Sequence, residues 1–122
     1  EVIIITETNV PHHENISSFG SGDDEAQMVY NFALPPLLLN SIVCSNTKKL
    51  TSWAKTLKLP SNKVCFFNFT ASHDGIGLRP VKGILSDEEV STIEKRNIFM
   101  MRNICLCNNN YFRSNFMYYF SH

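Results

Sequence analysis

The chain has 122 residues, 43% of them hydrophobic, and its 11 Lys and Arg residues balance its 11 Asp and Glu residues. A formal charge of zero provides no long-range field for nucleic acid or an anionic membrane, so neither is an expected partner. No apolar run approaches the ~20 residues that span a bilayer. The chain begins in an apolar run, without Met or a signal-peptide pattern, which predicts a fragment of a larger domain. Its cysteines are expected to be unpaired, which predicts a reducing cytoplasm.

Three segments are predicted to be buried strands because they are apolar and rich in β-branched or aromatic residues: 2–6, 27–34 and 63–69. Helical segments are expected between the second and third strands and after the third. This order predicts a parallel α/β sheet, either open or closed as a barrel. Three strands alone leave unpaired edges, so we do not expect this piece to be stable by itself.

The predicted helices lie at 37–44, at 50–59 and from Ser86 onward. Pro35 and Pro36 suit the first turn of the first helix, and Thr51 is a candidate cap for the second. Ser86 and Glu89 have the spacing of a capping box. Residues 14–22 are rich in Ser, Gly and Asn and are predicted to form a loop.

The cysteines and histidines predict neither a disulfide framework nor a metal site. Cys44 and Cys65 lie in apolar runs, where a buried free thiol behaves as a small hydrophobe. Cys105 and Cys107 are one residue closer than the usual Cys-x-x-Cys spacing, and metal binding there is only a distant alternative. Adjacent histidines in residues 12–14 point in opposite directions on an extended chain, so we interpret them as loop residues.

The C-terminal segment differs in composition from the rest of the chain. From residue 97 to residue 122 it is rich in Asn, Phe and Tyr and contains no Asp, Glu, Lys or Gly. Two hypotheses account for this segment: a structured C-terminal helix, or a tail, ordered or disordered, that arises from translation in the wrong frame or from read-through into noncoding sequence. The missing residue types favour the second.

Two polar clusters follow predicted strands, at the edge where parallel α/β proteins build their sites. Glu7 follows the first strand, and His73-Asp74-Gly75 follows the third. Position alone favours a solvated surface glutamate, and Asp-Gly is also a common turn dipeptide. Taken together, two carboxylates and a histidine near glycines suit a hydroxyl-rich ligand and glycosyl transfer.

Three blocks of sequence carry a resemblance to a known family: 2–9 (VIIITETN), 29–39 (VYNFALPPLLL) and 69–77 (FTASHDGIG). They resemble glycoside hydrolase family 13, the α-amylase family, and the second and third blocks resemble its sucrose phosphorylase branch. The resemblance covers residues 1–95 and implies a partial (β/α)8 TIM barrel that contains the fifth to seventh strands. The divergent tail, residues 96–122, takes no part in it.

The resemblance implies a role for each matching residue. Glu7 corresponds to the general acid/base, Asp74 to the transition-state stabiliser, and His73 to a residue that binds glucosyl hydroxyls. The family's aspartate nucleophile ends the fourth strand, which would precede the start of this chain, so the chain alone is expected to be inactive. Asn9 and Arg79 are further candidates for substrate binding, with a solvated arginine as the simpler interpretation of Arg79.

The implied reaction is a double displacement with retention, in which Glu7 protonates the leaving oxygen while the aspartate attacks. Phosphate then collects the glucosyl group. An α-glucosyl saccharide and phosphate are therefore the expected partners, with no metal and no cofactor. Thr8-Asn9 departs from the Ile-His expected in a sucrose phosphorylase and is similar to the phosphorylases of glucosylglycerate. An α-glucosidase or transglucosidase, and a non-catalytic sugar-binding remnant, stay open as alternatives.

Overall fold

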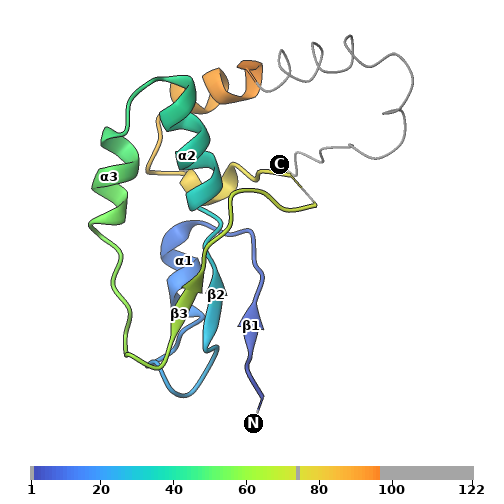
Figure 1. Cartoon of the computed structure of the whole chain (residues 1–122), viewed down its shortest axis with the longest axis vertical. Coiled ribbons are helices and arrows are strands. Elements are labelled where there is room, and N and C mark those ends of the chain that lie inside the picture. Colours follow the sequence, from blue (N-terminus) through green and yellow to red (C-terminus); the bar gives the residue numbers. More distant parts are fainter. Residues whose placement is uncertain (1, 74, 97–122) are drawn as a thin grey trace.

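Three short parallel strands form one sheet in the computed structural model, which describes residues 2–73 and 75–96 (Figure 1). The strands are β1 (Ile5–Thr6), β2 (Met28–Tyr30) and β3 (Cys65–Phe67), and they lie in the order β1-β2-β3. This confirms the predicted parallel α/β arrangement. Each strand is shorter than predicted, because only two or three residues of each apolar run pair with a neighbouring strand.

Helix α1 (His12–Ser17) lies between β1 and β2, so the prediction of a loop at residues 12–17 is wrong. The carbonyl oxygen of Pro11 accepts hydrogen bonds from the amides of Glu14 and Asn15, both at 3.0 Å. The fixed φ of proline and an acidic residue in the first turn both favour a helix here. This helix carries Asn15 into the interior of the protein.

Helices α2 (Leu34–Val43) and α3 (Lys48–Ala54) connect β2 to β3. The first turn of α2 contains the two prolines, as predicted. Helix α3 ends earlier than predicted, and the hydroxyl of Thr56 donates to the carbonyl oxygen of Trp53 at 2.6 Å. Thr51 is not its cap, because the helix begins after Thr47.

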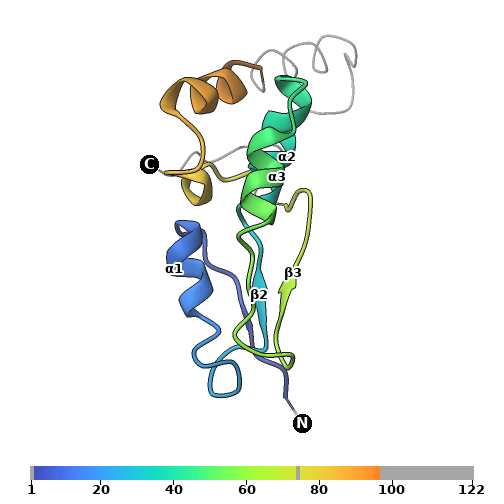
Figure 2. The same cartoon turned by 90° about the vertical axis from the view of Figure 1, so that its left-hand side faces the viewer.

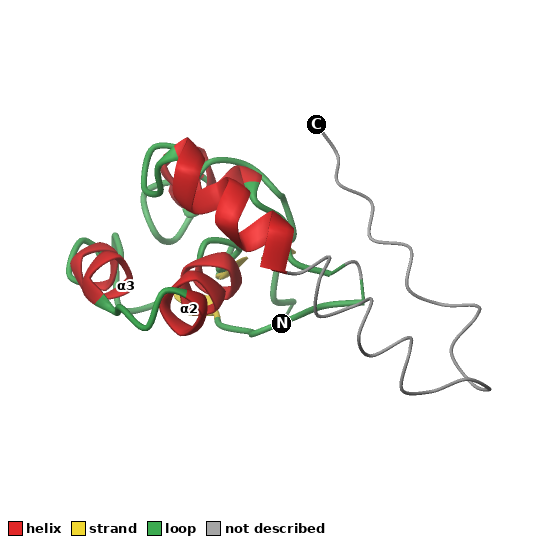
Figure 3. Cartoon of the chain, turned by 90° about the horizontal axis from the view of Figure 1, so that it is seen from above, coloured by secondary structure: helices red, strands yellow, loops and turns green. Residues whose placement is uncertain are grey.

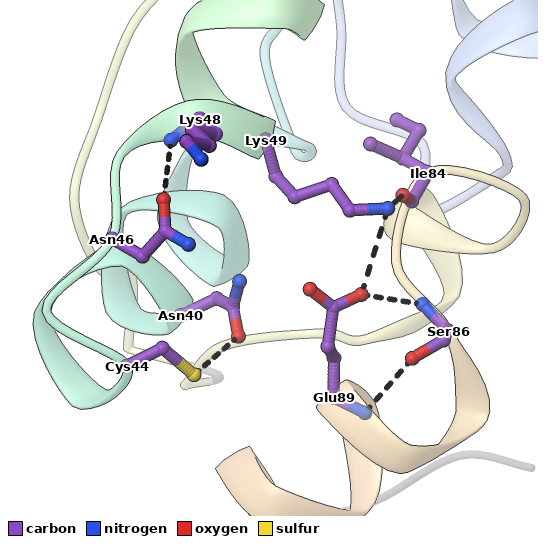
Figure 4. A network of polar contacts seen from close by, with 8 residues as sticks. All are labelled: Asn40, Cys44, Asn46, Lys48, Lys49, Ile84, Ser86 and Glu89. Atoms are coloured by element: carbon purple, nitrogen blue, oxygen red, sulfur yellow. Dashed lines mark hydrogen bonds and ion pairs between the residues drawn. The ribbon is translucent and has the colours of Figure 1, made fainter.

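The segment after β3 begins with the short 3-10 helix η1 (Arg79–Val81), and residues 87–96 are helical. The predicted capping box is confirmed: the amide of Ser86 donates to Glu89 Oε2 at 2.8 Å, and the amide of Glu89 donates to Ser86 Oγ at 3.2 Å (Figure 4). Lys49 Nζ lies 3.8 Å from the same Glu89 oxygen and 3.3 Å from the carbonyl oxygen of Ile84. These contacts connect α3 to the C-terminal helical segment.

Two apolar clusters form the core. One joins α2, α3 and the segment after η1, through Ala33, Leu37, Trp53, Val81, Leu85 and Ile93. The helices of this cluster lie beyond the carboxyl ends of the strands, and Figure 3 shows them from above. The other cluster joins α1 to the sheet, through Phe19, Ala26, Val29 and Val64, with Ile16 and Phe66 packed against it.

The sheet has one covered and one uncovered face. Figure 2 shows α1 on one side of the strands. The register aligns Thr6, Val29 and Phe66 on that side, which we call the covered face. The opposite, uncovered face carries the row of Ile5, Met28 and Cys65, followed by Tyr30 and Phe67.

Exposure of the cysteines corrects one expectation from the sequence. Cys65 on the uncovered face and Cys44 after α2 are both exposed free thiols rather than buried hydrophobes. Glu1, Asp74 and residues 97–122 lie outside the described residues, so all of the divergent tail except Arg96, with Cys105 and Cys107, is not described. No helix in the described part of the chain has the length and apolar character needed to cross a membrane.

Candidate active site at the carboxyl edge of the sheet

The carboxyl ends of the three parallel strands meet at one edge of the sheet. Glu7 directly follows β1, Asn31 directly follows β2, and Asn68 directly follows β3. Glu7 is exposed, and continuing the register of β1 aligns it with Tyr30 and so with the uncovered face. Glu7, the predicted general acid/base, therefore lies on the side of the sheet that α1 does not cover.

The chain after Glu7 is held by the buried side chain of Asn15, which is 1% exposed. Asn15 Nδ2 donates to the carbonyl oxygen of Tyr30 at 2.7 Å, and its Oδ1 accepts from the hydroxyl of Thr8 at 3.3 Å. The carbonyl oxygen of Thr8 accepts from the amide of Val10 at 3.1 Å. One helical residue thus connects the loop after β1 to the end of β2.

A second amide contact joins the end of β2 to the end of β3. Asn31, also 1% exposed, donates from Nδ2 to Asn68 Oδ1 at 2.8 Å. The backbone continues the same connection, because the amide of Asn31 donates to the carbonyl oxygen of Phe67 at 3.0 Å. The three strand ends are therefore fixed to one another by asparagine side chains.

Ser72 and Gly75 pair with each other in the loop after β3. The amide of Gly75 donates to the carbonyl oxygen of Ser72 at 3.1 Å, and Gly75 has a φ of 85°, which suits glycine. Gly77 leaves room for Asn9: a Cβ there would lie 2.7 Å from Asn9 Nδ2 and 2.8 Å from Asn9 Oδ1, so the Asn9 side chain would have to move. Asn9 thus packs directly on the loop that carries His73.

The predicted site residues have different positions along this edge. Glu7 and His73 are exposed, and Asn9 is partly buried against the 73–77 loop. Arg79 is exposed at the start of η1. Asp74 lies outside the described residues, so its predicted role stays a prediction.

Three buried oxygen atoms at or near this edge have no hydrogen-bond partner within the described residues: Thr6 Oγ1, Asn9 Oδ1 and Asn31 Oδ1. Amide and hydroxyl oxygens can accept hydrogen bonds from sugar hydroxyls. Within residues 2–73 and 75–96, no group of three or more His, Cys, Asp or Glu side chains is arranged to hold a metal ion. Thr6 lies on the covered face, and the alternation of β2 places Asn31 there too, so these two oxygens lie away from the side of Glu7.

One histidine near the site has a perturbed pKa. Burial, and then the neighbouring His13, lower the pKa of His12 below its usual value. Its ring lies 5.4 Å from the ring of Trp53 and 6.2 Å from that of Phe66, and neither ring nitrogen has a hydrogen-bond partner among the described residues. The neutral form of His12 therefore fits its apolar surroundings.

Sequence reasoning missed the asparagines that organise this edge. Asn31 and Asn68 follow their strands as Glu7 follows β1, so their positions in sequence are the signal that could have identified them. Asn15 carries no comparable signal, because the segment around it reads as a polar loop. Its role depends on a helix that places its amide beside Thr8 and Tyr30.

Comparison with known proteins identifies relatives that are sugar phosphorylases. The chain is 57% identical over 88 residues to a glucosylglycerate phosphorylase of Escherichia coli, and 52% identical over 95 residues to one of Allomeiothermus silvanus. It is 38% identical over 68 residues to a sucrose phosphorylase of Streptococcus mutans. The matches cover 72%, 78% and 56% of this chain. No protein-family model matches it.

The chain spans a small part of these relatives. The matched segment is 16% of the length of the E. coli protein, 17% of the A. silvanus protein and 13% of the S. mutans protein.

Proposed function

Because this chain is homologous to one segment of the glycoside hydrolase family 13 phosphorylases, we propose that it is part of a retaining α-glucoside phosphorylase. Its donor is glucosylglycerate or a related α-glucoside such as sucrose, and phosphate accepts the glucosyl group. The observation that supports this proposal is the carboxyl edge of the sheet, where Glu7 follows β1 and Asn9 packs against Gly77 of the loop that carries His73. The identity to glucosylglycerate phosphorylases favours that donor over sucrose.

In this proposal, the three strands are consecutive strands of a (β/α)8 barrel, the fifth to the seventh. The covered face is then the outside of the barrel, where helices pack, and the uncovered face is its interior. The exposed side chains of Val2, Ile3 and Ile5 support this interpretation, because at 83%, 64% and 49% exposure they suit burial by further strands.

The chemistry of this chain is the acid half of the reaction. Glu7 donates a proton to the leaving oxygen of the donor, and the carboxylate then accepts a proton from the incoming phosphate. Asp74 stabilises the positive charge that develops on the sugar ring, and His73 binds its hydroxyls. The attacking aspartate belongs to the part of the enzyme that precedes this segment, so the chain alone is inactive.

The proposed reaction uses phosphate as a co-substrate and requires no metal or other cofactor. Arg79 is the cationic candidate for a phosphate contact on this side of the site. The predicted cytoplasmic location and the expected absence of nucleic-acid and membrane partners stay predictions.

A chimera tests the function. The matched 88-residue segment of this chain replaces its counterpart in the E. coli glucosylglycerate phosphorylase, and release of α-glucose 1-phosphate from glucosylglycerate is measured. We expect activity in the chimera, and a decrease of about 10²–10⁴-fold in Glu7→Gln with poor leaving groups. Activated donors should lose less, because they need less proton donation.

Glu14→Gln is the matched control, because Glu14 is an exposed glutamate on α1 outside the proposed site, and its activity should be unchanged. A folded chimera that releases glucose but no glucose 1-phosphate would favour the α-glucosidase alternative. Equal losses for activated and poor leaving groups in Glu7→Gln would contradict the acid role.

A further inference from the structure

We propose that Thr8 and Asn15 are positioning residues for the acid: a hydrogen-bonded relay from Thr8 through Asn15 to Tyr30 fixes the backbone that carries Glu7. The inference rests on the proposed function for its catalytic consequence. Its structural part stands on contacts within this chain. Neither residue is expected to touch the substrate.

The relay consists of one short hydrogen bond, from Asn15 to Tyr30, and one longer hydrogen bond, from Thr8 to Asn15. The 2.7 Å bond from Asn15 Nδ2 to the carbonyl oxygen of Tyr30 anchors the asparagine to the last residue of β2. The 3.3 Å bond from the Thr8 hydroxyl to Asn15 Oδ1 then holds the residue next to Glu7. Asn15 is 1% exposed, so loss of either bond leaves a buried amide atom of Asn15 unpaired, whereas Thr8 is itself exposed.

The relay matters because β1 gives Glu7 little support of its own. The strand comprises only Ile5–Thr6, and Glu7 already lies beyond its last residue. Glu7 is exposed, so core packing does not hold its side chain. The positions of the next residues are defined by the Thr8–Asn15 bond on one side and by the contact of Asn9 with Gly77 on the other. A general acid that drifts by about 1 Å loses much of its rate advantage.

Hydrogen exchange on the folded chimera tests the structural part of the proposal. Thr8→Val removes the hydroxyl with little change of shape, and Thr8→Ser keeps it. Thr51→Val is the matched control, because Thr51 is exposed on α3 and far along the chain from the relay. We expect exchange at residues 7–10 to be about three- to tenfold faster in Thr8→Val than in the other two variants. Equal exchange in Thr8→Val and Thr51→Val overturns the proposal.

Kinetics of the chimera test the catalytic part. Thr8→Val should lower kcat for glucosylglycerate phosphorolysis about tenfold and change KM less than twofold, because only the placement of the acid is affected. Thr8→Ser should recover most of kcat, which a role in packing alone would not predict. A larger change in KM than in kcat overturns the positioning role. If the unsubstituted chimera releases no glucose 1-phosphate, the proposed function has failed, and the exchange experiment still decides whether the relay exists.

Discussion

The two faces of the sheet have similar residues but different surroundings. On the covered face, Val29 is fully buried beneath α1 and Phe19. On the uncovered face, Tyr30 and Phe67 stack with ring centroids 4.6 Å apart, yet Phe67 remains 39% exposed. Aromatic stacking therefore buries the uncovered face only in part. Glu7 lies on this same face, in register with Tyr30.

The first prediction compares the stability lost on truncating a phenylalanine packed under the covered face with that lost on truncating one on the uncovered face. Phe19→Ala should lower the free energy of unfolding by about 3–5 kcal/mol, because Phe19 is fully buried and its loss leaves a cavity. Phe67→Ala removes the same atoms from the uncovered face and should cost about 1 kcal/mol, mostly from the lost aromatic pair. Urea denaturation of the full chain measures both values. Equal losses would show that the faces do not differ in burial.

The second prediction concerns the contact of Asn9 with Gly77 at the carboxyl edge of the sheet. Gly77→Ala should destabilise the chain by about 1–3 kcal/mol, because the new Cβ overlaps the amide of Asn9. Adding Asn9→Ala should recover most of the loss, since the obstacle is then removed. Gly75→Ala is the control, because its cost of about 1–2 kcal/mol comes from its positive φ. Asn9→Ala should not rescue Gly75→Ala, and denaturation of all four variants tests the distinction.

The smallest expected effect is the pH dependence of the covered side. Because the pKa of His12 is lowered in the folded chain, its contribution to stability is complete above the unfolded pKa of 6.5. As the pH falls below that value, the unfolded chain takes up the proton first, so stability decreases until the folded pKa is passed.

His12→Phe keeps an aromatic ring between Trp53 and Phe66 and should flatten the urea midpoint between pH 5 and pH 7.5. His13→Gln should retain most of the dependence, because burial is the larger cause of the shift. An unchanged slope in His12→Phe would assign the pH dependence to another group.

Local patterns in the sequence were sufficient for several elements. The Ser86–Glu89 capping box and the prolines in the first turn of α2 are confirmed because they depend on residues a few positions apart. The parallel order follows from apolar runs separated by helices, which the structure also confirms. Helix α1 was missed because its polar residues carry no periodic apolar signal, and the pairing of β1 ended sooner than its apolar run.

The pattern of apolar runs was enough to predict a parallel α/β chain with Glu7 and His73 beyond the ends of its strands. Long-range packing sets which face of the sheet is covered, and which side chains hold the loop that follows Glu7. Asn15 reaches Tyr30, Asn31 reaches Asn68, and Asn9 meets Gly77. Each of these pairs is separated by many residues, so the contact depends on strand register and crossover geometry, which no local pattern encodes.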